Sequence, residues 1–188
     1  MQTTSHFIWI ELKTELFSDI FVCIYKYLQE NNIEDIVHFQ NPLSPHITLY
    51  YLEKDINLEN EEHIKNMIGK INLDNNIYIN SFNYFYKQKN DRFILFFTPK
   101  TSLNLKEYRN FFHKELQKDF VKDNNLEFIP HISFLKIVNS GIFEKHRKNI
   151  EEIIKENLQK IQNINCNTKN AFLYAVNSEF KEEIQIKV

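Results

Sequence analysis

Apolar side chains recur along this chain with two spacings, one typical of strands and one typical of helices. The run Phe7-Ile8-Trp9-Ile10-Glu11-Leu12 is aromatic and β-branched and predicts a strand. From Leu16 to Leu28, apolar residues return every three or four positions, which predicts a helix. The same patterns then predict a strand over 46–52, a helix over about 60–71 and a strand over 77–87.

The second half of the chain repeats this order of elements. The patterns predict a strand over 92–98, a helix over about 102–121, a strand over 128–138, a helix over 144–161, and strands over 171–176 and 183–188, the last two joined by a hairpin around Asn177-Ser178. An order that recurs indicates an internal duplication, with repeats at approximately 6–88 and 91–188. We expect one α+β domain over 1–188, in which two related sheets carry helices on their outer faces and a groove lies between them.

The two halves share one short motif at equivalent places. Pro45-His46-Ile47-Thr48 begins one predicted strand, and Pro130-His131-Ile132-Ser133 begins another about 85 residues later. Because alternate side chains of a strand share a face, His46 and Thr48 should point the same way, as should His131 and Ser133. If the repeats face each other, the groove is lined by two imidazoles and two hydroxyls.

This set of groups suits the cleavage of a phosphodiester. One histidine, neutral, removes a proton from the attacking hydroxyl or water, and the other, protonated, donates a proton to the departing oxygen. Thr48 and Ser133 can donate hydrogen bonds to the non-bridging phosphate oxygens as charge builds there. We expect no metal and no cofactor. A single His-x-Thr/Ser segment is more often part of a buried strand, so the prediction depends on the matched flanks and matched positions of the two copies.

The paired motifs resemble those of the 2H phosphoesterase superfamily, which includes the RNA 2',3'-cyclic phosphodiesterases (2'-5' RNA ligase-like, LigT-like) and viral 2',5'-phosphodiesterases. The resemblance covers the whole chain as architecture and the segments 45–52 and 130–136 as sequence. It implies a bilobal fold with pseudo-two-fold symmetry, two antiparallel sheets, outer helices and a central groove. It also implies His46 and His131 as the catalytic pair, with Thr48 and Ser133 binding phosphate.

Three further residues are candidates for substrate binding. Tyr51 falls where the family often has an aromatic residue, and Lys136 where bacterial members usually carry Arg; lysine keeps the charge and loses bidentate phosphate geometry. In an ideal strand both would lie on the face opposite the histidines, so a bulge or a strand end would be needed to bring them to the groove. Trp9 could stack a base, although a tryptophan on such a strand is more often part of the core.

Other polar residues near these segments carry less weight. His38 is expected in a surface loop, and Arg92 is expected to be an ordinary surface charge. The cluster Lys87-Gln88-Lys89 lies at a predicted turn and is a weak candidate for substrate capture. Cys23 is expected as a small buried residue of the first helix.

Composition restricts the partners. A net charge of -2 argues against binding long duplex nucleic acid through a broad basic face, but allows a small anionic substrate in a groove. The two cysteines follow no metal-ligand spacing, and no apolar run approaches the ~20 residues needed to cross a bilayer. We therefore expect a reduced, soluble, cytoplasmic monomer with no membrane partner, in the host cytoplasm if the source is a virus.

The leading hypothesis is a metal-independent phosphodiesterase that cleaves a small 2',5'-linked or cyclic nucleotide. Such a substrate would be a second messenger, for example a cyclic dinucleotide or a 2',5'-oligoadenylate, and its destruction would suit viral immune evasion. The first alternative is an RNA 2',3'-cyclic phosphodiesterase in RNA processing. An alternative of another class is a nucleotide-binding module that has kept the fold and lost turnover.

Overall fold

The computed structural model describes residues 4–39, 45–52, 58–120, 128–177 and 183–186. The first half contains β1 (Thr4–Leu12), α1 (Glu15–Glu30), a 3₁₀ turn (Glu34–Ile36), β2 (Val37–Phe39), β3 (His46–Leu52), α2 (Leu58–Ile68) and β4 (Ile77–Lys87). The second half contains a 3₁₀ turn (Gln88–Asn90), β5 (Arg92–Thr101), α3 (Leu105–Phe120), β6 (Ile132–Ile137), α4 (Ser140–Ile161), β7 (Asn167–Asn177) and β8 (Glu183–Ile186).

The strands form two antiparallel sheets of four strands each. The first sheet has the order β3-β1-β7-β8 and the second the order β2-β6-β5-β4. The prediction of an α+β fold with two antiparallel sheets is confirmed. β7 and β8 pair as predicted, while the residues that join them, 178–182, lie outside the described part of the chain.

Each sheet contains strands from both halves of the sequence. β4 ends the first repeat but pairs with β5, and β7 belongs to the second repeat but pairs with β1. The two sequence repeats therefore do not correspond to the two sheets. Each sheet therefore depends on backbone hydrogen bonds between the two halves of the sequence, and neither half could form a complete sheet by itself.

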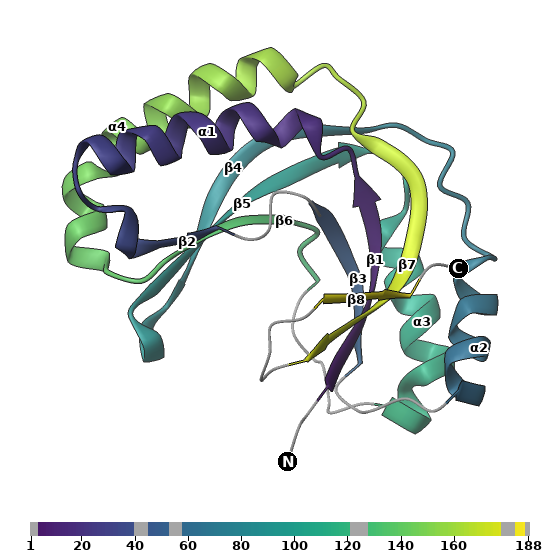
Figure 1. Ribbon diagram of the computed structural model, residues 1–188. Coiled ribbons are helices and arrows are strands. Elements are labelled where there is room, and N and C mark those ends of the chain that lie inside the picture. Colours follow the sequence, from purple (N-terminus) through teal and green to yellow (C-terminus); the bar gives the residue numbers. More distant parts are fainter. Residues whose placement is uncertain (1–3, 40–44, 53–57, 121–127, 178–182, 187–188) are drawn as a thin grey trace.

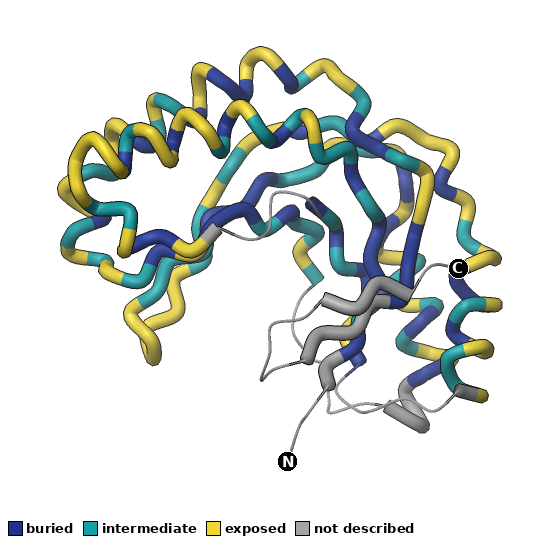
Figure 2. Tube along the Cα trace, viewed as in Figure 1, coloured by how far each residue is buried: buried dark blue, intermediate teal, exposed yellow. Residues whose placement is uncertain are grey.

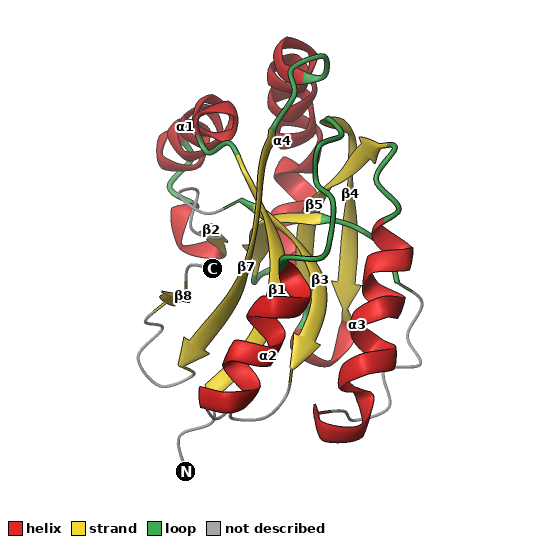
Figure 3. Cartoon of the chain, turned by 90° about the vertical axis from the view of Figure 1, so that its right-hand side faces the viewer, coloured by secondary structure: helices red, strands yellow, loops and turns green. Residues whose placement is uncertain are grey.

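Each sheet is likewise covered by one helix from each half of the sequence. Figures 1 and 3 show α1 and α4 over the outer face of the second sheet, and α2 and α3 over the outer face of the first. Phe17 of α1 packs against Phe97 of β5, with ring centroids 5.9 Å apart. On the other sheet, the Tyr50 hydroxyl of β3 lies 3.2 Å from Nδ1 of His113 on α3. No helix of the described residues covers the opposite face of either sheet (Figure 1).

The core lies between the sheets and these helices. Figure 2 shows buried residues along the central strands and on the inward side of each helix. Cys23 is a correction to the sequence analysis, because its side chain is exposed on α1. The other thiol, Cys166, is buried, and burial raises its pKa to about 12. No helix in the described part of the chain is both long and apolar enough to span a bilayer.

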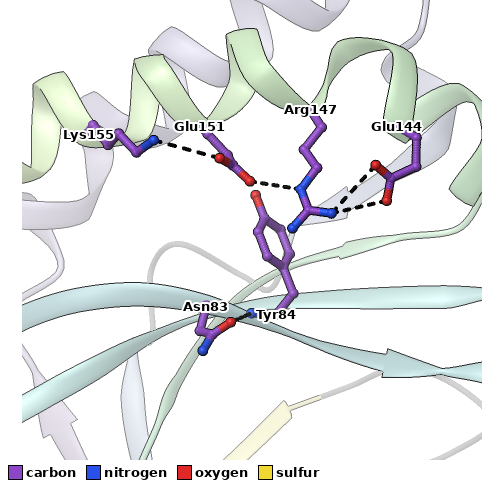
Figure 4. A network of polar contacts seen from close by, with 6 residues as sticks. All are labelled: Asn83, Tyr84, Glu144, Arg147, Glu151 and Lys155. Atoms are coloured by element: carbon purple, nitrogen blue, oxygen red, sulfur yellow. Dashed lines mark hydrogen bonds and ion pairs between the residues drawn. The ribbon is translucent and has the colours of Figure 1, made fainter.

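A polar cluster fixes α4 over β4 (Figure 4). The Arg147 guanidinium lies 5.1 Å from the ring centroid of Tyr84 and donates hydrogen bonds to Glu144 and Glu151. The Tyr84 hydroxyl is buried without a hydrogen-bond partner among the described residues. Burial, the largest cause, raises the pKa of Tyr84 well above its usual range, with Glu151 acting in the same direction. Tyr84 therefore stays neutral and packs as an aromatic ring.

Candidate active site

The first motif lies on a strand whose pairing is interrupted by one residue. In β3, Thr48 is opposite Trp9 of β1, whereas Tyr50 is opposite Ile8, the next residue of β1. Leu49 is therefore an extra residue without a partner in the register, which is a β-bulge.

The second motif has the same interruption at the same place. In β6, Ser133 is opposite Phe96 of β5, and Leu135 is opposite Leu95, so Phe134 is the extra residue. Each motif thus runs histidine, apolar residue, hydroxyl residue, bulge. The equivalence of the two halves extends from the sequence to the detail of the backbone pairing.

The bulges place two of the predicted residues on the same face as the histidines. Each bulge shifts by one residue the alternation of side chains between the two faces of the sheet. Tyr51 then pairs with Phe7 and Lys136 pairs with Ile94, on the same face as the motif histidine of each sheet. Tyr51 and Lys136 are exposed and equivalent in position. From His46 to Leu52 and from His131 to Ile137 the exposure is identical residue by residue, with half-buried histidine and hydroxyl positions and an exposed sixth residue. We call the helix-free side of each sheet, which carries the motif histidine, the motif face.

His46 lies against aromatic rings of β1. Its ring centroid is 4.0 Å from that of Trp9 and 5.7 Å from that of Phe7, with Phe7 stacked at 29°. Trp9 is only 2% exposed and shares a small apolar cluster with Phe172 of β7. The indole therefore lies in the core beside the histidine, as is more common for a tryptophan on such a strand, and not on the surface where it could stack a base.

His131 is held by a backbone carbonyl and two further rings. Its Nδ1 lies 2.8 Å from the carbonyl oxygen of Ile129. Because a carbonyl only accepts, Nδ1 carries the proton of this bond and Nε2 is the nitrogen left to act on a ligand. Phe85 and Phe96 meet the imidazole edge-on, with centroids 5.1 Å and 5.6 Å away.

Sequence reasoning singled out Trp9 but missed the other supporting rings, those of Phe7, Phe85 and Phe96. Trp9 is opposite Thr48 and Phe96 is opposite Ser133, so the two aromatic residues occupy equivalent places beside the two motifs. Alternation along β1 and β5 could have assigned each ring to a face. Only the register between strands, which the sequence does not encode locally, shows which ring adjoins which histidine.

The two motif faces adjoin. β3 and β6 belong to different sheets but contact each other, and each has its helices on the opposite side. His46 and Thr48 thus lie on one side of this contact, and His131 and Ser133 on the other. His38 is not in a loop as predicted: it lies on β2, exposed, opposite Lys136.

The described residues contain no group of three or more His, Cys, Asp or Glu side chains that could hold a metal ion; the metal-independent mechanism stays a prediction. Two surface hollows lie elsewhere. One, of about 410 Å³, is lined by residues 69–74 and Lys169, and one, of about 200 Å³, is lined by residues of α3 and by Lys70 and Ile71, which follow α2. No motif residue lines either hollow, so neither belongs to the candidate site.

Comparison with known proteins gave matches only among solved structures. No family model and no curated protein matches the sequence. The structure is similar to that of E. coli LigT in complex with 3'-AMP, with a TM-score of 0.62 at 14% identity over 99% of this chain and 95% of LigT. A structure described as a phosphoesterase matches with a TM-score of 0.59 at 14% identity over 99% of this chain and 95% of its own.

A third similar structure is Usb1 of Kluyveromyces marxianus, with a TM-score of 0.54 at 10% identity over 98% of both chains. Since LigT is a 2H phosphoesterase, the resemblance that the two motifs suggested is confirmed at the level of the fold.

Proposed function

We propose that this chain is a phosphodiesterase of the 2H superfamily that acts on nucleotides, with His46 and His131 as its acid–base pair. Thr48 and Ser133 bind the non-bridging oxygens of the phosphate, and no metal takes part. The preferred substrate is a small 2',5'-linked or cyclic nucleotide messenger. Removal of an immune messenger by a virus is one setting in which this activity would be useful.

The observation that carries the proposal is the shared plan of the two motif strands. Each has a half-buried histidine, a half-buried hydroxyl residue two positions on, and a bulge directly after it. A buried structural histidine would not require the hydroxyl and the bulge to recur on the second strand. Solved structures of the same fold add support, since LigT is known with bound 3'-AMP and Usb1 with uridine monophosphate.

On a 2',5' linkage the free 3'-hydroxyl is the nucleophile. The neutral histidine takes the proton from O3' as O3' forms its bond to phosphorus. The P–O5' bond breaks, and the protonated histidine gives its proton to O5'. The products are a 2',3'-cyclic phosphate and a 5'-hydroxyl, and the negative charge on the phosphate is held by hydrogen bonds from Thr48 and Ser133.

The alternative substrate is an RNA end with a 2',3'-cyclic phosphate. There the neutral histidine takes a proton from water, water oxygen bonds to phosphorus, and the other histidine protonates the departing ribose oxygen. The same four side chains suffice, so the two substrates differ in which oxygen attacks and which oxygen departs.

The experiment is an assay of the purified protein in EDTA against 2',5'-oligoadenylates, cyclic dinucleotides and RNA with 2',3'-cyclic ends. We expect turnover in EDTA and a loss of about 10²–10⁴-fold in kcat for His46→Ala and for His131→Ala. His63→Ala is the matched control, because His63 is exposed on α2, away from both motifs.

Each outcome separates the candidate functions. Activity confined to the RNA ends would favour the RNA-processing alternative. Nucleotide binding without turnover, unaffected by either alanine variant, would favour the silent binding module and overturn the proposed enzyme.

A further inference from the structure

Basic side chains extend the motif face of the second sheet away from His131. His38 of β2 pairs with Lys136 of β6, and Lys136 pairs with Ile94 of β5. Two residues along β5, Arg92 pairs with Lys87 of β4. Because directly paired residues share a face and alternate residues return to it, these four basic residues are all on the motif face. We call them the basic row (His38, Lys87, Arg92 and Lys136).

The basic row is continuous with the candidate site. Phe85 and Phe96, which contact His131, lie on the same face of the neighbouring strands. From Phe96 to Arg92 is four residues of β5, about 13 Å at the usual rise of a strand. Along the strand direction, Lys136 lies between Phe96 and Arg92, because it pairs with Ile94. The row therefore begins near the reacting phosphate and leads to the end of the β4–β5 hairpin.

The charges at the far end of the row are not neutralised by ion pairs. Neither Lys87, which is exposed, nor Arg92, which is half-buried, forms an ion pair with any residue that the structure describes. The nearest acidic residue in the sequence, Asp91, accepts a hydrogen bond from the Tyr86 hydroxyl. Tyr86 pairs with Phe93 and lies on the opposite face, so this carboxylate is drawn away from the row.

The motif face of the first sheet differs. At the position equivalent to Lys136 it has Tyr51, and the strand beside it contributes Phe7, Trp9 and Glu11. The two motifs are symmetric and aromatic rings lie beside both, but the surfaces beyond them differ: the second sheet carries the basic row, and the first carries Tyr51 and Glu11. An asymmetric surface suits a substrate whose two ends differ, such as a linear chain.

We propose that the basic row binds further phosphates of a linear oligonucleotide, next to the phosphate that is cleaved. This inference rests on the proposed function and narrows its substrate class. A 2',5'-linked oligonucleotide and an RNA end share the required chemistry, a row of phosphates on one side of the reacting bond. A cyclic dinucleotide has only two phosphates in a closed ring and cannot follow the row to Arg92.

The test is a length series. kcat/KM is measured at low salt for 2',5'-linked adenylate dimer, trimer and tetramer without terminal phosphates, and for RNA dimers and tetramers ending in a 2',3'-cyclic phosphate. We expect kcat/KM to rise about tenfold or more from dimer to tetramer in whichever series is cleaved, and to fall with salt more steeply for the tetramer. The series that is cleaved identifies the source of the phosphates.

The variant is the double substitution Lys87→Gln, Arg92→Gln. It should reduce the tetramer-to-dimer ratio of kcat/KM toward one and lower the salt slope for the tetramer by about 0.7 for each cation removed. The control is Lys145→Gln, Lys148→Gln on α4, where both lysines are exposed and belong to the helix-covered side of the sheet. A tetramer-to-dimer ratio near one in the wild-type protein, or an unaltered ratio in the double variant, would show that the basic row does not bind further phosphates.

Binding separates failure of the basic row from failure of the proposed function. Affinities of fluorescein-labelled oligomers for the His46→Ala variant are measured by fluorescence anisotropy. If the wild-type protein turns over nothing and affinity still rises with length, the row stands and the enzyme is overturned. If affinity does not depend on length, the row is overturned whatever the turnover.

Discussion

The indole of Trp9 lies against the imidazole of His46, with their ring centroids 4.0 Å apart. Phe96 stands in the same relation to His131 in the other half of the chain, at 5.6 Å. Both aromatic residues are nearly fully buried, at 2% and 4% exposure. Each histidine therefore rests on a fixed ring of the neighbouring strand, and such packing restricts the rotamers that the imidazole can adopt.

Replacing this ring should misplace the histidine. We expect Trp9→Leu to lower kcat by at least about tenfold with a smaller change in KM, because an imidazole free to rotate spends less time in the reactive position. Trp9→Phe, which keeps a ring beside His46, should retain most of the activity. Steady-state kinetics with a thermal unfolding curve for each variant checks this. A Trp9→Leu protein that is folded and has wild-type kcat would contradict the positioning role.

The two hydroxyl residues should contribute to the transition state. Thr48→Ala and Ser133→Ala are each expected to reduce kcat by about 10²–10³-fold, the usual cost of removing one hydrogen bond to a developing oxyanion. Thr48→Ser keeps the hydroxyl and should recover most of the loss. Ser18→Ala on α1 is a control remote from the motifs. Equal losses in Thr48→Ser and Thr48→Ala would show that the methyl group, and not the hydroxyl, matters.

Tyr84 offers a test of the packing between β4 and α4. Its buried hydroxyl lacks a hydrogen-bond partner within the described residues, so Tyr84→Phe should leave the free energy of unfolding unchanged or raise it by up to about 1 kcal/mol. Tyr84→Ala removes the ring under Arg147 and should lower it by about 3–5 kcal/mol. Urea denaturation measures both. A loss above about 1 kcal/mol in Tyr84→Phe would reveal an interaction of the hydroxyl.

Stability should fall at alkaline pH. Burial raises the pKa of Cys166 to about 12 from an ordinary value of 9.0. Above pH 9 the unfolded chain has therefore lost this proton while the folded protein still holds it, which favours unfolding. The free energy of unfolding should be unaffected by this thiol below pH 9 and decrease by up to about 1.4 kcal/mol per pH unit between pH 9 and 12.

Urea denaturation at pH 8.5, 9.5 and 10.5 measures that slope. Cys166→Ala should have a shallower slope in this range, although its stability at pH 8.5 is lower because a cavity is left. Tyr50 and Tyr84, whose pKa values burial also raises, add to the decrease above about pH 10 in both proteins. The same slope with and without Cys166 would contradict this assignment.

Local patterns predicted most of the elements well. The strands expected over 46–52 and 77–87 have those bounds in β3 and β4. α4 begins at Ser140, four residues before the predicted start, because the Asn139 side chain caps it by accepting a hydrogen bond from the Ile142 amide. β2 was missed. It has only three residues, too few for a periodic pattern, and follows a 3₁₀ turn.

The sequence by itself determined which residues are candidates for the chemistry, because the residue types and their spacing of two along each strand are local properties. It placed His46 with Thr48 and His131 with Ser133 on common faces. Tertiary structure decided the rest: the exchange of strands and helices between the lobes, the rings beside each histidine, and the bulges at Leu49 and Phe134 that turn Tyr51 and Lys136 to the motif face. These features depend on the register between strands that are distant in the sequence, and a shift of one residue in that register reverses every face.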